Sequence, residues 1–313
     1  DSLALNYEIL ATQDDSSCEY PITSQTIIFP QGWSTFSTYM VNENMLVDHL
    51  LSPVLENIVI VKNYLGSAYI PEWEFNGIGD LTIGQGYPIK MRASENIIIT
   101  GANSGIGFEL VKTLSNYENN ILAFINLNDD KILSIRNKNI KIIKCNFSNP
   151  ENINNYSDEI KEFKPNILIN CAATFGSENQ NFNNLIIKEF NTIININVLA
   201  PFTLIQNSLK SNSLKQIVNI SSLMGSMSNN NGDYYLYRSS KSLLNSITKN
   251  LSFDIDQKIN IFCLHPGDVK TKMNTGGLVS PEIAAQKIIN ICSKNNFNYR
   301  GKFIDTNGNI LSW

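Results

Sequence analysis

From Ser94 onward, the chain alternates short apolar runs with longer amphipathic stretches. Short runs of Ile, Leu and Val are typical of strands that are buried on both faces of a parallel sheet. The expected strands are Asn96 to Thr100, Ile121 to Asn126, Ile140 to Lys144, Ile167 to Asn170, Gln216 to Ser221, Ile259 to Leu264 and Lys302 to Ile304. The helix-like stretches are Phe108 to Ser115, Glu151 to Phe163, Leu185 to Ser211, Tyr237 to Phe253 and Pro281 to Ser293. Seven strands with helical crossovers predict an α/β fold with a Rossmann-type, doubly wound, seven-stranded parallel sheet over residues 94–313.

Residues 1–93 lack this rhythm and predict a small, separate α+β module. Strand-like runs at Thr26 to Phe29, Ile58 to Lys62 and Ile89 to Met91 surround one helix-like stretch near Met45 to Leu55. The first 23 residues are rich in Asp, Ser and Thr and have little apolar periodicity, so we expect an extended tail there. The predicted domains are therefore a tail over 1–23, a module of unknown role over 24–92 and a large domain over 94–313.

Composition narrows the classes of function. The net charge of -4 supplies no basic field for nucleic acid. No apolar run reaches the roughly 20 residues needed to cross a bilayer. The five cysteines show no CxxC spacing, and a total of two histidines argues against a metal cluster or a Ser-His-Asp hydrolase. We therefore expect no nucleic-acid, membrane or metal partner.

A glycine-rich turn follows the first strand of the large domain and leads directly into a helical pattern. It reads Thr100-Gly101-Ala102-Asn103-Ser104-Gly105-Ile106-Gly107. Glycines at such a turn let the backbone approach a pyrophosphate, whose charge is stabilised by free N–H groups at the helix start. Ordinary strand–helix turns also contain glycines, so the prediction of a dinucleotide site depends on the motifs that follow.

The most specific of these motifs is Tyr237-Arg238-Ser239-Ser240-Lys241, which places Tyr237 and Lys241 on one face of a helix. Lowering the pKa of a tyrosine from about 10 to near 7 requires about 4 kcal/mol of phenolate stabilisation. One buried lysine together with a positively charged cofactor ring would supply it. The same spacing also occurs by chance on solvated helices, so it gains meaning only in combination with other motifs.

Taken together and in this order, the motifs resemble those of the short-chain dehydrogenase/reductase family. The glycine turn has the family's TGxxxGIG form. The segment Asn170-Cys171-Ala172-Ala173 resembles the family's NNAG, from which Cys171 and Ala173 depart, and Pro266-Gly267 with Thr271 resembles its PGxxxT. The resemblance implies an NAD(P)-dependent oxidoreductase that transfers a hydride between the nicotinamide and a carbonyl or alcohol substrate.

The resemblance also implies roles for individual residues. Tyr237 would be the general acid or base, and Lys241 would lower its pKa and hold the nicotinamide ribose. Ser222 would hydrogen-bond the substrate oxygen, and Asn197 would fix a water that links Lys241 to solvent. The implied cofactor-binding residues are Gly101, Asn103, Ser104, Gly105, Ile106, Gly107, Asn126, Asn146, Phe147, Asn170, Ala172, Tyr237, Lys241, Pro266, Gly267, Val269 and Thr271.

The preferred nicotinamide cofactor is encoded weakly. The second strand ends in Asn126, where an acidic residue would favour NAD by binding the ribose hydroxyls. Ser104 stands where many NADP-using relatives have a basic residue, although Lys131 or Lys112 could reach a 2′-phosphate. The sequence therefore favours NADP(H) over NAD(H) and leaves NAD(H) open.

Two further resemblances, one in the large domain and one in the small module, add alternatives to the predicted function. The long spacing from Ser222 to Tyr237 resembles the C-factor-like branch of the family, which includes carbonyl reductases and proteins with assigned signalling roles. Residues 24–92 resemble a small module of surface or secreted proteins of Bacteroidetes. That match implies export, whereas a nicotinamide reductase is expected in the cytoplasm.

The leading prediction is a cytoplasmic carbonyl reductase or alcohol dehydrogenase with a small-molecule substrate. By resemblance, it would form a homodimer or homotetramer through the helices at Leu185 to Ser211 and Tyr237 to Phe253. The glycine-containing loop from Lys272 to Val279 should cover the substrate, and His265 is expected to be structural. One alternative is an NAD(P)-binding signalling protein with little turnover. Another is that the first module, as a glycan or protein binder, carries the function.

Overall fold

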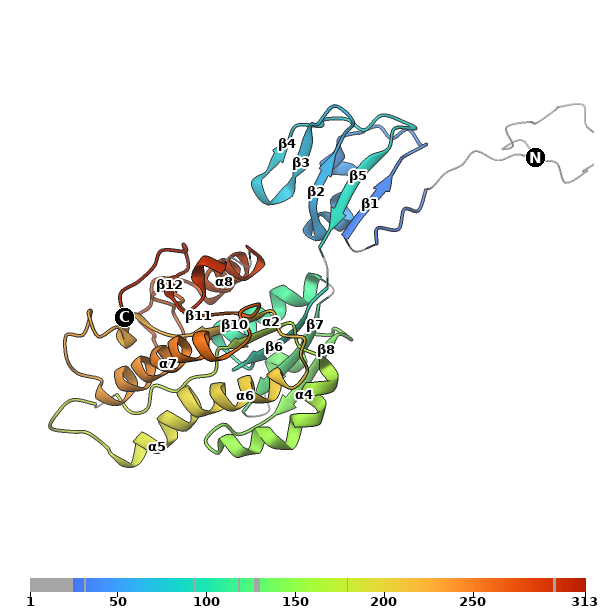
Figure 1. Cartoon of the computed structure of the whole chain (residues 1–313). Helices are drawn as coiled ribbons and strands as arrows, with labels where there is room; N and C mark the ends of the chain where they lie inside the picture. The colour runs from blue at the N-terminus through green and yellow to red at the C-terminus, as the bar shows by residue number, and fades with distance from the viewer. Residues whose placement is uncertain are drawn as a thin grey trace, which may run out of the picture. The chain divides into compact units, whose positions relative to one another are not determined.

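The computed structural model describes residues 25–30, 32–92, 94–117, 119–126, 130–178, 180–294 and 297–313. The predicted tail over residues 1–23 lies outside the described residues. The chain divides into two compact units, Asp1–Ala93 and Ser94–Trp313 (Figure 1).

A seven-stranded sheet forms the centre of the larger unit, and all its neighbouring strands run parallel. The strands are β6 (Asn96–Thr100), β7 (Asn120–Ile125), β8 (Ile140–Lys144), β9 (Ile167–Asn170), β10 (Gln216–Ile220), β11 (Asn260–His265) and β12 (Phe303–Asp305). Their order is β12-β11-β10-β9-β6-β7-β8, so the winding direction reverses between β6 and β9. This confirms the predicted doubly wound Rossmann-type sheet. Ligands of such sheets bind at the carboxyl ends of the strands beside the reversal.

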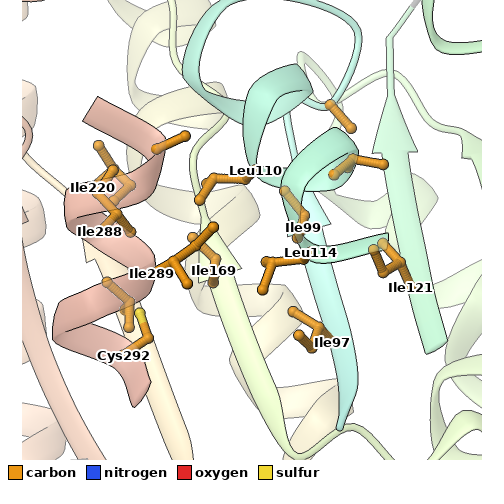
Figure 2. Packing of buried hydrophobic residues seen from close by; sticks show 14 of the residues in the cluster. Ile97, Ile99, Leu110, Leu114, Ile121, Ile169, Ile220, Ile288, Ile289 and Cys292 are labelled. Carbon is orange, nitrogen blue, oxygen red and sulfur yellow. The ribbon is translucent and has the colours of Figure 1, made fainter. Parts of the chain in front are cut away.

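Helices cover both faces of this sheet because its strands are apolar on both sides. The helices are α2 (Gly105–Leu114), α3 (Asp130–Leu133), α4 (Ser157–Phe163), α5 (Lys188–Ile194), α6 (Ala200–Leu209), α7 (Tyr235–Asp254) and α8 (Pro281–Lys294). In β6, Ile97 and Ile99 belong to an apolar cluster with α2 and α8, whereas Ile98 belongs to a second cluster with α4 and α6. Figure 2 shows the first cluster, with Leu110 of α2 and Ile288 of α8 over the strands.

Two predicted helices are divided into segments. The first begins with a 3-10 segment, Pro150–Tyr156, before α4. The second begins at Lys188 and contains a π-helical turn, Asn195–Leu199, between α5 and α6. Apolar periodicity does not reveal such a wide turn, and π turns are frequent at functional sites.

The smaller unit is a five-stranded antiparallel sheet with the order β1-β5-β2-β3-β4. Its elements are β1 (Gly32–Phe36), α1 (Val47–Leu50), β2 (Ile58–Lys62), β3 (Ala68–Ile70), β4 (Phe75–Asn76) and β5 (Tyr87–Met91), with a 3-10 segment at Ser52–Asn57 and another at Pro71–Trp73. Alternate residues of β5, Tyr87, Ile89 and Met91, face the core of this unit together with Val47 of α1. The fold agrees with the predicted small α+β module.

The prediction of a strand at Thr26 to Phe29 is wrong, because residues 25–30 form no strand. Both edges of β5 are already occupied by β1 and β2. Phe29 instead packs edge-on against Phe36, with ring centroids 5.3 Å apart. The Gln25 side chain accepts a hydrogen bond from the Tyr39 N–H. The alternation at 26–29 therefore reflects side-chain packing and not strand pairing.

Candidate active site

An open cleft of about 1010 Å³ lies at the carboxyl ends of the parallel strands. Its walls are the loops after the six strands β6 to β11, the π turn and the start of α7. The predicted residues that line it are Gly101, Asn103, Ser104, Gly105, Ile106, Gly107, Asn126, Phe147, Ala172, Ser222, Tyr237, Lys241, Pro266, Gly267, Val269 and Thr271. The predicted residues Asn146, Asn170 and Asn197 are not among its lining residues.

The glycine turn packs closely against the end of β9. Gly101 has a φ of +68°, and a Cβ there would lie 2.9 Å from the Ala172 Cα. A Cβ at Gly107 would collide with the Gly101 carbonyl oxygen. Thr100 Oγ1 accepts hydrogen bonds from the N–H groups of Cys171 and Ala172, each at 2.9 Å. The turn is therefore held in place, and the first turn of α2 lines the cleft where an anion would meet its N–H groups.

Ser222, Tyr237 and Lys241 meet in the cleft. Tyr237 and Lys241 lie one turn apart on α7, and Ser222 precedes the 3-10 segment Leu223–Gly225 after β10. Ser222 hydrogen-bonds the Tyr237 side chain. The Lys241 ammonium donates to the Ile220 carbonyl at 2.9 Å and lies 5.9 Å from the centroid of the Tyr237 ring.

Burial dominates the pKa values of this group. Desolvation raises the pKa of Tyr237 to about 12, although the hydrogen bond with Ser222 opposes the rise. Desolvation lowers the pKa of Lys241 to about 8, against the influence of the thiols of Cys171 and Cys263. From the sequence we expect a Tyr237 pKa near 7 when a nicotinamide is in place. The polypeptide alone moves this pKa upward, because the phenol is desolvated.

The Asn197 side chain is fully buried in the π turn and joins two segments. Its Nδ2 donates to the Thr174 carbonyl at 2.9 Å and to Ser240 Oγ at 3.0 Å, while its Oδ1 accepts from the Thr174 N–H at 2.8 Å. Both N–H groups of the amide are thus used within the protein. The side chain holds the loop after β9 against α7, which positions Tyr237 and Lys241.

The other two predicted residues outside the cleft have local partners. Asn170 is buried, and its Nδ2 donates to Asn219 Oδ1 at 2.8 Å. Asn219 in turn donates to Thr248 of α7 at 2.8 Å. Asn146 accepts from the N–H and Oγ of Ser148 at 2.9 and 2.7 Å. Asn170 therefore links β9 through β10 to α7, and Asn146 shapes the turn after β8.

The cleft is also lined by Phe175, Glu178 and Tyr234, which were not predicted from the sequence, whereas Met273 belongs to the loop from Lys272 to Val279 that was expected to cover the substrate. The ring of Phe175 lies 4.7 Å from that of Tyr237 and 5.3 Å from that of Tyr234, measured between centroids. The signal available in the sequence is position, since Phe175 lies shortly after the Asn170-Cys171-Ala172-Ala173 motif at the carboxyl end of β9.

His265, expected to be structural, supports the turn that follows Ser222. Its Nδ1 accepts the Leu223 N–H at 3.3 Å. Burial lowers the pKa of His265, while Asp305 and Asp268 act in the opposite direction. The neutral ring that can accept this bond is therefore favoured.

Three further features of the described residues concern metal ions, membranes and thiols. Within these residues, no group of three or more His, Cys, Asp or Glu is placed to hold a metal ion. No helix in the described part of the chain is both long and apolar enough to cross a membrane. The four described cysteines, Cys145, Cys171, Cys263 and Cys292, carry free thiols.

Curated proteins provide two informative relatives. An uncharacterized oxidoreductase of Schizosaccharomyces pombe is 30% identical over 223 residues, which are 63% of this chain and 82% of the relative. C-signal of Myxococcus xanthus is 30% identical over 127 residues, which are 38% of this chain and 75% of that protein. The second match agrees with the predicted resemblance to the C-factor-like branch.

Solved structures match the fold over nearly their whole length. The carbonyl reductase Sniffer of D. melanogaster has a TM-score of 0.65 and 26% identity, covering 71% of this chain and 100% of that one. The NADPH-bound carbonyl reductase from chicken fatty liver has a TM-score of 0.63 and 25% identity, covering 70% and 99%. A 4-hydroxyisoleucine dehydrogenase complexed with NADH and succinate has a TM-score of 0.59 and 25% identity, covering 67% and 96%.

The sequence model of one protein family covers the glycine turn and the residues that meet in the cleft. The model described as short chain dehydrogenase matches residues 95–277, which is more than half of the chain and includes the glycine turn, Ser222, Tyr237 and Lys241. The parallel sheet and the order of the motifs agree with this match. The chain belongs to the short-chain dehydrogenase family.

Proposed function

We propose that this protein is an NAD(P)-dependent oxidoreductase that interconverts a carbonyl and an alcohol, with Tyr237 as the general acid or base. The observation that carries the proposal is the meeting of Ser222, Tyr237 and Lys241 in one cleft with the glycine turn. The relatives named as oxidoreductases and carbonyl reductases support the same chemistry.

The glycine turn fits a dinucleotide. Side chains at Gly101 or Gly107 would collide with neighbouring backbone, so the turn keeps a bare surface where a pyrophosphate can approach. In this proposal Asn126 and Phe147 lie beside the adenosine, whereas Pro266, Thr271 and their neighbours flank the nicotinamide. When bound, the cofactor supplies or accepts the hydride.

The residues of the chain handle the proton. In reduction, the carbonyl carbon accepts the hydride and the carbonyl oxygen accepts a proton from Tyr237. Burial raises the pKa of Tyr237 to about 12, so the phenol carries its proton at neutral pH, and transfer of that proton requires stabilisation of the phenolate. Ser222 would hold the carbonyl oxygen, and the Lys241 charge would stabilise the phenolate that remains.

Replacing Tyr237 tests the proposal. We expect Tyr237→Phe to lower kcat for carbonyl reduction by roughly 100-fold or more, since a general acid contributes about that much. The dissociation constant for NADPH should stay within about 2-fold of the wild-type value, because the phenol hydroxyl alone is removed. Tyr235→Phe is a matched control, as Tyr235 is the neighbouring exposed tyrosine on α7. Full activity in Tyr237→Phe would refute the assignment of the acid.

We further propose a preference for NADP(H). Ser104, Lys131, Lys270 and Lys272 line a second depression that shares the glycine turn with the main cleft. Lys131 lies 4.0 Å from the Glu109 carboxylate, and its ammonium lies over the Phe108 ring at 4.1 Å. A positive side chain beside the turn favours a cofactor with an additional phosphate, and we assign this role to Lys131 because Lys270 and Lys272 flank Thr271 at the nicotinamide end.

Assembly and compartment follow the same proposal. Apolar side chains on α5 and α7 are exposed in the single chain, among them Phe190, Leu243 and Phe253. We propose that they meet a second copy in a homodimer or homotetramer, which light scattering of the purified chain would show.

A reaction that consumes reduced nicotinamide fits the cytoplasm, and localisation of a tagged full-length chain would test this.

The match to C-signal motivates a second candidate, an NAD(P)-binding signalling protein with little turnover. Its cleft would bind the cofactor as proposed above. Saturable NADPH binding with no hydride transfer to any member of a broad carbonyl panel would favour this candidate over the reductase.

A further inference from the structure

The cleft beside the proposed acid is walled by apolar side chains from several segments. Phe175 follows β9, Leu223 and Met224 follow Ser222, Tyr234 precedes α7, and Met273 belongs to the loop after β11. The rings of Phe175 and Tyr237 are tilted by 40° with centroids 4.7 Å apart. Tyr234 meets Phe175 edge-on at 5.3 Å. Phe175 therefore packs against the ring of the proposed acid, and Tyr234 packs against Phe175.

A buried glutamine fixes this wall. Gln180 is 1% exposed, and its Nε2 donates to the carbonyls of Phe175 and Ser177 at 2.6 and 2.8 Å. Its Oε1 accepts the Tyr237 N–H at 2.9 Å, and its own carbonyl accepts the Tyr235 N–H at 3.1 Å. The backbone of Phe175 is thus tied to the first turn of α7. The wall is preorganised relative to Tyr237.

Tyr234 is held in an unusual backbone conformation. Asp233 and Tyr234 have φ values of 54° and 52°, in the left-handed region that bulky residues rarely adopt. The side chain of Tyr234 is nevertheless large, lines the cleft and remains 39% exposed. Strain of this kind persists where the surrounding structure holds it, and it occurs most often at functional sites. A glycine would fit the backbone better, so the ring itself needs an explanation.

We propose that Phe175 and Tyr234 select substrates in which the carbonyl is attached to a planar aromatic group. The substrate ring would stack against this pair while its oxygen lies between Ser222 and Tyr237. Aromatic rings prefer offset or edge-on contacts with other rings, whereas a saturated ring is thicker and lacks the matching charge distribution. The inference deepens the proposed function and depends on it.

The test compares two aldehydes of equal carbon count, benzaldehyde and cyclohexanecarboxaldehyde, with NADPH and the full chain. The measured quantity is the ratio of their kcat/KM values, which removes differences in enzyme quality between preparations. We expect Phe175→Leu and Tyr234→Leu each to lower the aromatic-to-saturated ratio by about 3- to 10-fold, the range for losing one aromatic pair. The loss should fall mainly on KM for benzaldehyde.

Two further variants separate recognition from structure. Tyr235→Leu removes the neighbouring tyrosine, which does not line the cleft, and should leave the ratio unchanged. Tyr234→Gly relieves the left-handed strain, which offsets the lost contact with Phe175, so its Tm should change little, yet its ratio should drop as in Tyr234→Leu. A merely structural role of Tyr234 would not produce that combination.

The possible outcomes distinguish a failure of aromatic selection from a failure of the proposed reductase function. An unchanged ratio in Phe175→Leu and Tyr234→Gly, with both aldehydes reduced, would overturn aromatic selection and leave the reductase proposal intact. Reduction of neither aldehyde by the wild-type chain would also overturn the inference. The proposed function fails only when a wide carbonyl panel yields no hydride transfer.

Discussion

Tyr237 and Lys241 are both buried, yet burial moves their pKa values in opposite directions because their charged forms differ in sign. The pKa of the phenol rises to about 12, and that of the ammonium falls to about 8. Each shift favours the neutral form of the side chain. The protein alone therefore supplies Tyr237 as a protonated phenol for the reduction of a carbonyl. Oxidation of an alcohol would require additional positive charge to stabilise the phenolate.

His265 gives a prediction for pH dependence. Its pKa is lowered from 6.5 by burial, and the groups that face it are Asp305 of β12 and Asp268. A depressed pKa means that the unfolded chain binds the proton more readily. The stability from neutral His265 is therefore fully present above about pH 6.5 and is lost as the pH falls toward the lower folded pKa. Protonation also removes the Nδ1 acceptor of the Leu223 N–H.

Thermal unfolding from pH 7.5 to 5.5 checks this expectation. The wild-type Tm should fall with decreasing pH, whereas His265→Asn, which keeps an acceptor oxygen near the Nδ1 position, should fall less. The turn after Ser222 is affected by the same bond, so kcat of the wild type should decline over the same interval. Identical Tm profiles for the two proteins would show that His265 does not control this turn.

At the scale of elements, the start of α7 depends on a residue that is distant in sequence. Gln180 accepts hydrogen bonds from the N–H groups of Tyr235 and Tyr237, and the N-cap position of α7 provides no side-chain bond. We expect Gln180→Leu to lower the free energy of unfolding by about 2 to 4 kcal/mol, because several buried polar groups lose their partner. The substitution should also lower kcat, because the Tyr237 backbone loses the hydrogen bond to Gln180 that holds it in position. Chemical denaturation and steady-state kinetics measure the two effects.

Gln286→Leu is the matched control for Gln180. The Gln286 side chain bonds Asn290 on the exposed side of α8, and surface replacements of this kind usually change stability by less than about 0.5 kcal/mol. Equal losses of unfolding free energy in Gln180→Leu and Gln286→Leu would contradict this expectation. In that case the clamp, meaning the hydrogen bonds by which Gln180 ties the loop after β9 to α7, would not contribute to stability.

The elements also show what sequence can and cannot predict. The strands of the larger unit were predictable within about one residue because their Ile-rich runs are buried on both faces. The glycine turn and the Tyr237 to Lys241 spacing were recognisable because their chemistry restricts residue type. The clamp by Gln180 was not predictable, since it joins residues 57 positions apart in a segment without periodicity. Strand β1 was missed because Gly32–Phe36 contains few apolar residues.

At the scale of the whole molecule, the proposed chemistry belongs to the unit Ser94–Trp313. The Drosophila carbonyl reductase is matched over its full length by 71% of this chain, about the share that this unit makes up. The smaller unit has its own core and exposes Trp33 and Trp73. Its resemblance to a module of surface proteins stays a prediction, and the reductase proposal does not depend on it.

Titration of the full chain with NADPH and NADH in parallel, followed by nicotinamide fluorescence, tests whether the cleft binds a nicotinamide cofactor. We predict saturable binding of both, tighter for NADPH. Lys131→Ala should weaken NADPH by roughly 5- to 10-fold, as expected for a loss of about 1 kcal/mol, and leave NADH unchanged. Lys112→Ala is the matched control, because Lys112 also pairs with Glu109 but does not line the depression. Equal effects of Lys131→Ala on both cofactors would contradict the preference for NADP(H), and no binding of either cofactor would contradict the account as a whole.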